Sequence, residues 1–486
     1  MNLSLKSFYK SLQGKRVSLI GLGRTHRPLI SIFAAQGSKV FLRDRRTREA
    51  IGAEECAALE AMGATLVLGE NYLEGLGENS DLILRTPAVH FNLPQLQEAR
   101  AMGVVVTSEQ ELFFQFCPCP AYGITGSDGK TTTTSIIAEL FRAQGKRVFL
   151  GGNIGNPLFQ IVEEIKPEDV AVVELSNFQL LSMGVSPDVA VITNISPNHL
   201  DFHKDMDEYI FAKKNIFLHQ NGFGRAVLNW DNQTTRSFLP QARGDRMVFS
   251  RLEPVERGVF LSSEGWLTAA ENGQKTKIIH KDEIRIPGAH NVENYLAAFA
   301  AVLGHVSLEN MAAVAKSFGG VAHRIEFVRD LKGVMWYNDS IASSPTRTIS
   351  GLNTFRQKIV LIAGGYDKKI PYAPLAPFIL EKAKALILMG ATGPKIEEAV
   401  AAAAGQESFA KEEQPLPGLT APVAVTLLPQ LSIYHASTME EAVSIANAIT
   451  ENGDIVSLSP ASASFDSYAD FEARGNHFKQ LVQALQ

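Results

Sequence analysis

The sequence has 486 residues, of which 45% are hydrophobic and 20% are charged, and these are ordinary values for a globular protein with a large core. At roughly 100–200 residues per domain, a chain of this length is expected to form about three domains. The net charge of −5 comes from 46 basic and 51 acidic side chains, which argues against a broad nucleic-acid-binding surface but allows a local basic pocket.

The N-terminus has no features of a targeting segment. Residues 1–16 lack an uninterrupted apolar stretch, so we expect no signal peptide, and no run approaches the ~18 apolar residues of a membrane span. The three cysteines, Cys56, Cys117 and Cys119, are too few for a disulfide framework and indicate a reducing compartment. We therefore expect a soluble, cytoplasmic protein with neither nucleic acid nor membrane as a partner.

The first expected domain, residues 1–120, opens with a Rossmann-type pattern. An apolar strand is followed by the turn Gly21-Leu22-Gly23, a helix, a second strand and the acid Asp44. His26 stands where a third glycine would fall, so the turn is either a dinucleotide site or only a tight strand-to-helix connection. The alternation continues, and it predicts a parallel sheet with helices on both faces. The expected strands are Val17–Ile20, Lys39–Leu42, Ala64–Leu68, Asp81–Leu84 and Gly103–Val106.

The segment Phe116-Cys117-Pro118-Cys119-Pro120 is stiff and predicts a domain boundary. Its two cysteines are candidate metal ligands, but the sequence has no second cysteine pair to complete a zinc site. A rigid interdomain linker is the favoured interpretation.

Two further α/β domains are expected, at 121–320 and 321–486. The central one ends in two helices, Asn291–Leu303 and Leu308–Phe318, before Gly319-Gly320. Between 253 and 286 the pattern indicates short strands and turns. The main expected strands of both domains are Ala121–Thr125, Val170–Glu174, Val189–Thr193, Gly333–Tyr337, Lys358–Ala363, Ala385–Met389 and Asp454–Leu458.

The strongest local motif is Gly123–Thr134, which joins a strand to a helix and contains Gly129-Lys130-Thr131. Glycines let backbone N–H groups converge on phosphate oxygens, the helix N-terminus adds positive potential, and the hydroxyl suits Mg²⁺. The standard spacing would place the first glycine at position 124, which is Ile124 here. The motif therefore predicts a variant P-loop.

Two acidic or histidine-containing segments follow strands and are candidate metal sites. Glu174 ends an apolar strand, where the carboxyl ends of parallel strands line ligand crevices. His199 and His203 are four residues apart with Asp201 between them, and neither a third histidine nor a cysteine lies at a typical zinc spacing. A magnesium and substrate site is favoured over a zinc site or a purely structural loop.

Eight short blocks occur in one order along the chain. They are Gly123–Thr134, Glu174–Gln179, Asn198–Asp201, Tyr209–Lys213, His290–Asn294, His323–Glu326, Asn338–Ser340 and Leu458–Gly475. Their residues and their order resemble those of the Mur ligase superfamily, over essentially the whole chain. The resemblance implies three domains, one for the UDP end of a substrate, one for ATP and a mobile C-terminal one.

The Gly21–Gly23 turn and the Leu458–Gly475 block look most like the D-glutamate-adding branch of the superfamily. The implied reaction is the ATP-dependent joining of D-glutamate to a UDP-linked muramoyl-L-alanine substrate in peptidoglycan synthesis. It would proceed through an acyl phosphate and release ADP and phosphate. We expect the enzyme to act as a monomer.

The resemblance also implies site residues. Lys130, His199 and Lys213 are the implied catalytic residues. Two Mg²⁺ ions would be held by Thr131, Glu174, His199 and Lys213, the last carrying a CO₂-derived carbamate, because a carbamate anion can bind magnesium where an ammonium would repel it. The implied ATP-binding residues are Gly126, Ser127, Asp128, Gly129, Lys130, Thr131, Thr132, Asn291, Asn294, Arg324 and Asp339. Gly23, Arg24, Thr25, Asp44, Arg46 and Asn153 would bind the UDP-linked substrate, and Ser343, Lys368, Ser464 and Phe471 the acceptor.

The chain departs from the superfamily in two places. Ile341-Ala-Ser-Ser344 follows Asn338–Ser340 where lysine, alanine, threonine and asparagine are common, and the Ser343 hydroxyl is expected to substitute for that threonine. Asn198 stands where aspartate is frequent. These departures keep the reaction class and leave open a sister ligase that adds L-glutamate or a diamino acid.

A dehydrogenase or a ligase-like binding subunit would explain less of the chain. An NAD-dependent dehydrogenase would use Gly21, Gly23 and Asp44, but it leaves the P-loop and the C-terminal half unexplained. A ligase-like subunit of an amidating complex would carry a four-cysteine zinc site, which three cysteines cannot build.

Overall fold

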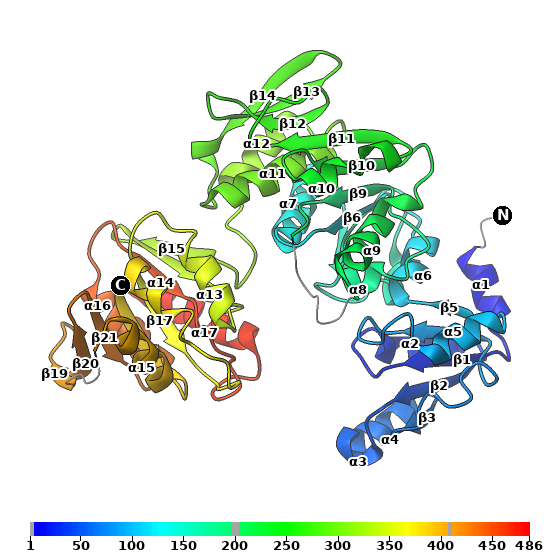
Figure 1. Cartoon of the computed structure of the whole chain (residues 1–486), viewed down its shortest axis with the longest axis horizontal. Coiled ribbons are helices and arrows are strands. Elements are labelled where there is room, and N and C mark those ends of the chain that lie inside the picture. The colour runs from blue at the N-terminus through cyan, green and yellow to red at the C-terminus, as the bar shows by residue number, and fades with distance from the viewer. Residues whose placement is uncertain (1–3, 197–203, 407–410) are drawn as a thin grey trace. The chain divides into compact units, whose positions relative to one another are not determined.

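The structure is a computed structural model that describes residues 4–196, 204–406 and 411–486 (Figure 1). The chain folds into two compact units: unit 1 contains Met1–Ile284 and His290–Lys316, and unit 2 contains Arg285–Ala289 and Ser317–Gln486. The finer division expected at residues 120 and 320 stays a prediction. No helix in the described ranges is long and apolar enough to cross a membrane.

The first sheet of unit 1 has five parallel strands in the order β3-β2-β1-β4-β5. Its central strands β1 and β4 are buried at nearly every position, as expected for parallel strands that are covered on both faces. The strands are β1 (Arg16–Ile20), β2 (Lys39–Asp44), β3 (Ala64–Leu68), β4 (Leu82–Arg85) and β5 (Val105–Thr107). The helices are α1 (Leu5–Ser11), α2 (His26–Ala35), α3 (Arg48–Ile51), α4 (Ala53–Ala61), α5 (Pro94–Ala101) and α6 (Glu109–Phe116).

The second sheet of unit 1 has nine strands in the order β14-β13-β12-β11-β10-β9-β6-β8-β7. The strands are β6 (Ala121–Thr125), β7 (Val148–Gly152), β8 (Val170–Glu174), β9 (Val189–Ile192), β10 (Arg225–Asn229), β11 (Asp245–Ser250), β12 (Gly258–Leu261), β13 (Trp266–Glu271) and β14 (Gln274–His280). The helices are α7 (Lys130–Ala143), α8 (Asn177–Leu180), α9 (Met206–Leu218), α10 (Gln233–Arg236), α11 (Ala289–Val302) and α12 (Leu308–Ser317), with 3-10 turns η1 (Phe159–Glu164), η2 (Leu239–Gln241) and η3 (Lys281–Glu283).

Strand β6 lies at the point where the chain stops adding strands on one side of the sheet and starts adding them on the other. The chain runs from β6 out to β7 and back through β8, and then crosses to β9 on the other side of β6. In parallel α/β sheets such a switch point opens a crevice at the carboxyl ends of the strands, and ligands bind there. The loop after β6 is therefore in the position where this fold binds ligands.

One hydrophobic core joins the two sheets of unit 1. It contains side chains from the helices of the first sheet, among them Phe33 and Phe113, together with Phe159 from η1. The ring of Phe159 lies 6.4 Å from that of Phe33 and 6.4 Å from that of Phe116, measured between centroids. The two sheets are thus held in one packed unit.

Unit 2 is built on an eight-stranded sheet in the order β15-β16-β22-β17-β18-β21-β20-β19. Val360 and Ile362 pack into one hydrophobic cluster and Leu361 into another, because successive side chains of a strand point to opposite faces. The sheet therefore has a core on each face. The strands are β15 (Glu326–Leu331), β16 (Val334–Asn338), β17 (Ile359–Gly364), β18 (Ala383–Met389), β19 (Lys411–Gln414), β20 (Val423–Leu428), β21 (Leu431–His435) and β22 (Ile455–Leu458), and the helices are α13 (Pro345–Leu352), α14 (Ala376–Lys382), α15 (Gly393–Ala403), α16 (Met439–Ile449) and α17 (Phe471–Ala484).

These sheets confirm the α/β class with three separate sheets. The strand expected at Gly103–Val106 begins later in the structure, because β5 starts at Val105. Gly103 has a φ of 83° and its N–H bonds to Arg100 O at 2.9 Å, so it terminates α5 in the left-handed conformation that glycine adopts readily. The strand can begin only after this cap.

Candidate functional site

The motif around Gly129 forms a tight loop between β6 and α7. Gly126 and Gly129 have φ values of 152° and 77°, where side chains other than glycine are strained. A Cβ at Gly126 would collide with Thr193 Oγ1, and one at Gly129 with Asn294 Oδ1. Backbone conformation and space therefore both require these two glycines.

Residues after β9 hold the loop from the side. Asn194 O accepts a hydrogen bond from Ser127 N at 2.9 Å, and its side-chain oxygen accepts one from Asp128 N at 3.0 Å. Thr193 Oγ1 donates to Asp128 O at 2.5 Å. These bonds fix the loop just before the start of α7, and the N-terminus of a helix is a position that favours anions.

Lys130, Thr131 and Thr132 form that first turn. Lys130 Nζ donates to Gly126 O at 2.9 Å and to Ser127 O at 3.0 Å, so the ammonium lies across the loop. Thr131 is half-buried and Thr132 is buried. A cation and helical amides thus converge at one end of α7, an arrangement suited to phosphate oxygens.

Lys213, on α9, lies beneath the same loop and is only 1% exposed. Its Nζ donates to Gly126 O at 2.8 Å and lies 4.8 Å from the centroid of the Tyr209 ring, while Tyr209 OH is hydrogen-bonded to Ser127 Oγ at 2.9 Å. Burial, and then the nearby positive charge of Lys130, lower the pKa of Lys213 well below its usual value. This amine therefore loses its proton more readily than an exposed lysine does, and the neutral amine is a nucleophile.

Glu174, at the end of β8, is 1% exposed and offers an oxygen to a cation. Its Oε1 accepts a hydrogen bond from Asn153 Nδ2 at 2.6 Å, whereas Oε2 is buried and has no hydrogen-bond partner within the described part of the chain. A buried carboxylate oxygen without a donor is costly, and Mg²⁺ prefers such hard oxygen ligands. This orphaned oxygen fits the metal role expected of Glu174.

Of the other three expected metal ligands, the structure describes two. Thr131 lies in the first turn of α7, and Lys213 is linked to β6 through Thr125 Oγ1 at 3.5 Å. His199, like Asn198 and His203, lies outside the described residues. Within those ranges, no three His, Cys, Asp or Glu side chains are grouped to hold a metal ion.

Asn291 and Asn294 lie together on α11 and reach the phosphate loop. Asn294 Nδ2 donates to Asn291 Oδ1 at 3.1 Å, and Asn294 Oδ1 accepts from Thr133 Oγ1 at 3.3 Å. The structure therefore brings together the residues expected around the phosphate loop, on α11 and at Lys213, although they are spread over more than 160 residues of sequence.

Five of the six expected UDP-binding residues lie at or just after the carboxyl ends of β1 and β2, whereas Asn153 follows β7. Asp44 accepts hydrogen bonds from Leu22 N at 2.7 Å and from Arg46 Nε at 2.9 Å. Burial raises the pKa of Asp44, but the bonds from Arg46 and Leu22 outweigh it and leave the pKa below its usual value. Gly23 and Thr25 complete this turn, and both are half-buried. Thr25 is the N-cap of α2.

His26 replaces the third glycine of a dinucleotide turn. It is fully buried, and its Nδ1 lies 2.9 Å from Gly21 O. Burial lowers its pKa to about 4, so the ring is neutral at pH 7. Arg24, which lies two residues before it, donates to Gly155 O and so places the first sheet's turn beside the segment that contains Asn153.

Arg85 was not predicted as a site residue, yet it joins the two halves of unit 1. It ends β4, is 2% exposed, and its Nη2 donates to Phe178 O at 3.0 Å and to Ser182 Oγ at 2.7 Å. Burial lowers its pKa to about 10. Phe178 lies on α8, four residues after Glu174, so Arg85 fixes the segment that follows the candidate metal ligand. The only signal in the sequence is a charge at the end of an apolar strand.

In unit 2, the blocks around His323 and Asn338 meet. Glu326 Oε2 accepts from Asn338 Nδ2 at 3.0 Å and from His323 N at 2.8 Å. Asp339 is 4% exposed and accepts from Ser459 Oγ at 2.7 Å, and burial raises its pKa to about 7. Arg324 is exposed.

The expected acceptor residues fall into two places within unit 2. Tyr366 N bonds to Ala463 O at 2.9 Å, which brings the segment containing exposed Lys368 beside the one containing Ser464. Ser464 is 2% exposed. Phe471 O accepts from Ser340 Oγ at 2.8 Å. Ser343 lies in the turn that precedes α13.

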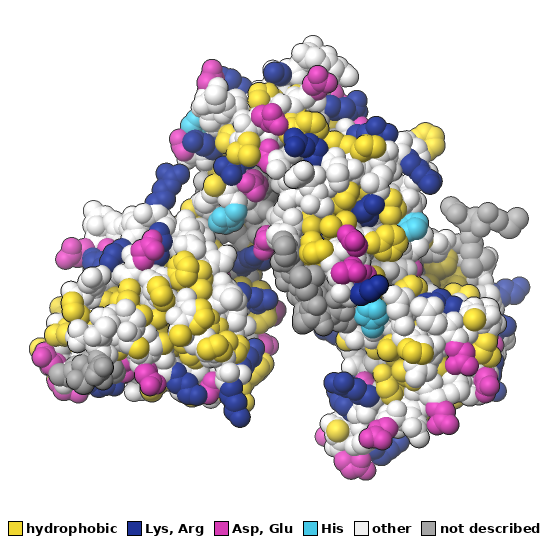
Figure 2. All heavy atoms as spheres, viewed as in Figure 1, with side chains coloured by type: hydrophobic (Ala, Val, Ile, Leu, Met, Phe, Trp, Pro, Cys, Tyr) yellow, Lys and Arg dark blue, Asp and Glu magenta, His cyan; other side chains and the backbone are white. Residues whose placement is uncertain are grey.

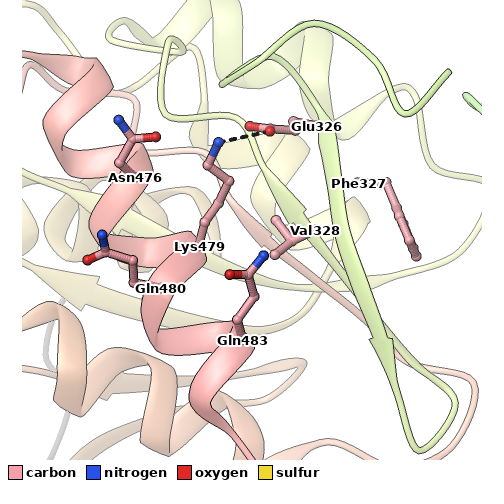
Figure 3. Close-up of a pocket in the computed structure, with 7 residues that line it drawn as sticks. All are labelled: Glu326, Phe327, Val328, Asn476, Lys479, Gln480 and Gln483. Atoms are coloured by element: carbon pink, nitrogen blue, oxygen red, sulfur yellow. Dashed lines mark hydrogen bonds and ion pairs between the residues drawn. The ribbon is translucent and has the colours of Figure 1, made fainter.

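An open pocket of about 410 Å³ in unit 2 lies between β15 and α17. Its wall carries the ion pair of Lys479 Nζ with Glu326 Oε1 at 3.0 Å, and Asn476, Gln480 and Gln483 present amides from α17 (Figure 3). None of the expected acceptor residues lines it. Over the face of unit 2 seen in Figure 2, hydrophobic side chains are mixed with charges of both signs.

Comparison with known proteins gives consistent matches. Residues 124–302 match the model of the Mur ligase middle domain, and residues 323–462 match that of the Mur ligase, glutamate ligase domain. The chain is 45% identical over 486 residues to the UDP-N-acetylmuramoylalanine--D-glutamate ligase of Acetivibrio thermocellus and 44% identical over 486 residues to that of Clostridium acetobutylicum, with 100% of each chain covered in both cases. Among solved structures, the UDP-N-acetylmuramate-alanine ligase of Thermotoga maritima is similar in fold, with a TM-score of 0.53 and 18% identity over 97% of this chain and 99% of that one.

Proposed function

Because this chain belongs to the Mur ligase family, we propose that it uses ATP to join D-glutamate to the carboxylate of UDP-N-acetylmuramoyl-alanine. The observation that carries the proposal is the 45% identity along the full length of a relative with that activity in its name. The product would be an intermediate of peptidoglycan synthesis.

In the first step, an oxygen of the substrate carboxylate attacks the γ-phosphorus of ATP. A P–O bond forms, the bond to the β-phosphate oxygen breaks, and ADP leaves behind an acyl phosphate. Phosphoryl transfer mainly requires positioning and neutralisation of negative charge. Lys130 and the amides of the first turn of α7 would supply both, and Asn291 and Asn294 would bind the nucleotide.

Glu174 Oε2 and Thr131 Oγ1 would hold Mg²⁺, with a carbamate on Lys213 as a further oxygen ligand. Bound there, Mg²⁺ neutralises charge on the phosphate oxygens. The carbamate would form when the neutral Lys213 amine attacks CO₂: an N–C bond forms, one C=O π bond breaks and leaves its electron pair on oxygen, and the nitrogen releases a proton to solvent. The burial of this amine and its lowered pKa support this proposal. The side chain of Lys213, a cation when it is protonated, thereby becomes an anion.

In the second step, the unprotonated amine of D-glutamate attacks the acyl carbon. An N–C bond forms, phosphate leaves, and the nitrogen loses a proton to give the amide. We assign Lys368 to a carboxylate of the acceptor and Ser343, Ser464 and Phe471 to its orientation. Arg324 and Asp339 would bind the ribose and phosphates of ATP. Gly23, Arg24, Thr25, Asp44, Arg46 and Asn153 would bind the UDP-linked substrate.

Lys368→Ala is expected to weaken the use of D-glutamate about 10- to 100-fold, because a charge-assisted hydrogen bond to a carboxylate contributes roughly 1.5–3 kcal/mol. The KM for ATP should stay nearly unchanged. Steady-state phosphate release at varied D-glutamate and varied ATP separates the two effects. Lys369→Ala is the matched control, because this neighbour is also exposed. An equal loss in both variants, or a higher KM for ATP, would contradict the role of Lys368.

Ser343→Ala is the sharper test of the acceptor site, because the lysine and threonine common in the family near position 341 are absent here. We expect a higher KM for D-glutamate if the Ser343 hydroxyl has replaced that threonine. Ser344→Ala, at the N-cap of α13, serves as a control for general damage to the turn. A Ser343→Ala enzyme with unchanged KM would exclude this contact.

The reaction class is tested against a dehydrogenase activity by coupled measurements on one sample. Release of ADP and phosphate should require the UDP-linked substrate and the amino acid together, and nicotinamide absorbance should not change. Nicotinamide turnover without ADP release would overturn the proposal.

A further inference from the structure

Two thiols lie together where α6 is followed by β6, and the proposed ligase reaction uses neither. Cys117 caps the C-terminus of α6 in an extended conformation, with φ −61° and ψ 121°. In extended backbone, residues two apart point to the same side, and the prolines of Cys117-Pro118-Cys119-Pro120 restrict the segment. The two Sγ atoms are accordingly 3.6 Å apart, and Cys117 Sγ lies 3.5 Å from Cys119 O.

We propose that Cys117 and Cys119 are a reversible modification site that reacts with small-molecule disulfides, such as oxidised glutathione, to form a disulfide within the chain. A disulfide requires an S–S distance of about 2 Å, so the sulfurs need to approach by only about 1.5 Å from their 3.6 Å separation. Metal binding is less well supported, because no third His, Cys, Asp or Glu in the described ranges joins the pair into a metal-binding group.

The surroundings of the two sulfurs assign them different roles. Cys117 is half-buried, whereas Cys119 is 5% exposed. The hydrogen bond from the Cys119 thiol lowers the pKa of Cys117, while the same bond and burial raise the pKa of Cys119. Cys117 is therefore the attacking thiolate and Cys119 the resolving thiol.

The exchange proceeds in two displacements. The Cys117 thiolate attacks one sulfur of the small disulfide, whose S–S bond breaks, and one small thiolate leaves. Cys119 passes its proton to that thiolate and attacks Cys117 Sγ, which expels the second small thiolate. In sum, two protein thiols are oxidised to one disulfide and one small disulfide is reduced to two thiols. A short, constrained disulfide of this kind is readily reduced again.

Cys56 provides a control within the same chain. It is 0% exposed on α4, and its sulfur lies 3.9 Å from Arg48 O. Since it is the third of three cysteines, every thiol in the protein is assigned to the pair or to this control. It should stay reduced while the pair reacts.

The test treats the folded, full-length protein with oxidised glutathione and follows intact mass and free thiols. The wild type should lose the mass of two hydrogens and two of its three thiols, and dithiothreitol should restore both. Cys119→Ser should stop at a mixed disulfide and gain one glutathione, whereas Cys117→Ser should react at least about 10-fold more slowly. Cys56→Ser should behave like the wild type.

Peptide mapping of the oxidised wild type gives a measurement that does not depend on any variant: the Cys117–Cys119 link should be found within one proteolytic peptide. The proposal is overturned if the wild type accumulates glutathione adducts without that link. It is equally overturned if Cys56→Ser loses the reaction, because the reacting thiol would then be Cys56.

Discussion

Lys130→Ala is expected to abolish ATP-dependent phosphate release while the protein stays folded. Lys130 Nζ lies over the phosphate loop at 2.9 Å from Gly126 O, where it can move to a phosphate oxygen when nucleotide binds. Removing one charged donor from a transition state that develops negative charge costs on the order of 10²-fold in rate or more. The measurement is phosphate release under saturating substrates, together with a thermal unfolding curve.

The fold should survive because α7 begins at Lys130 and its buried side chains lie at later positions. Lys146→Ala, which removes an exposed lysine just beyond the other end of α7, should keep wild-type turnover. A Lys130→Ala enzyme with near wild-type release would refute the assignment of the loop to ATP. If the loss of activity came from unfolding, the variant would show a lowered melting temperature. Lys130→Met, which keeps the apolar stem of the side chain, would then test the loss of the charge alone.

Lys213→Ala is expected to be nearly inactive, and formate or acetate should restore part of the activity. The reason is the proposed carbamate: a small carboxylate can take its place at the metal when the side chain is shortened. Because Lys213 is buried and its pKa is lowered, the amine loses its proton more readily than an exposed lysine does, and the neutral amine is the form that reacts with CO₂. The wild type should accordingly lose activity when CO₂ is removed from the buffer and regain it on addition of bicarbonate.

Lys214→Ala is the matched control, since Lys214 is the next residue on α9 and its Nζ lies 5.4 Å from the Phe238 ring centroid. It should show neither the loss nor the rescue. Rescue should also be absent from Lys130→Ala, whose defect has a different cause. A crystal structure that shows an unmodified Lys213 amine with two metal ions bound would defeat the idea, as would full activity of Lys213→Ala.

Apolar runs made much of the fold predictable. The expected strands Ala121–Thr125 and Val170–Glu174 coincide with β6 and β8, because buried parallel strands have uninterrupted apolar sequences. Strand β19 was missed for the opposite reason: its sequence, Lys411–Gln414, is charged and exposed at the edge of the sheet. The periodicity of a sequence cannot reveal a strand whose side chains face water on both sides.

The candidate site was predictable where its residues are close in sequence. The glycines of the phosphate loop and the acid that ends β8 follow from strand and turn patterns, and the structure shows why those glycines are required. The contacts by which Arg85 joins the two halves of unit 1 are different, because these partners lie 93 and 97 residues away along the chain. Such contacts depend on tertiary packing, as do the desolvation of Lys213 and the orphaned oxygen of Glu174.

The central claim is that this enzyme adds D-glutamate, and the most direct measurement is a panel of acceptors. Phosphate release is followed with ATP, Mg²⁺ and UDP-N-acetylmuramoyl-L-alanine against D-glutamate, L-glutamate, a diamino acid and no amino acid, and the product is identified by mass. D-Glutamate should give the highest kcat/KM, with one D-glutamate added to the product for each phosphate released. Preference for L-glutamate or for the diamino acid would contradict the claim. So would a rate of phosphate release that does not depend on the amino acid.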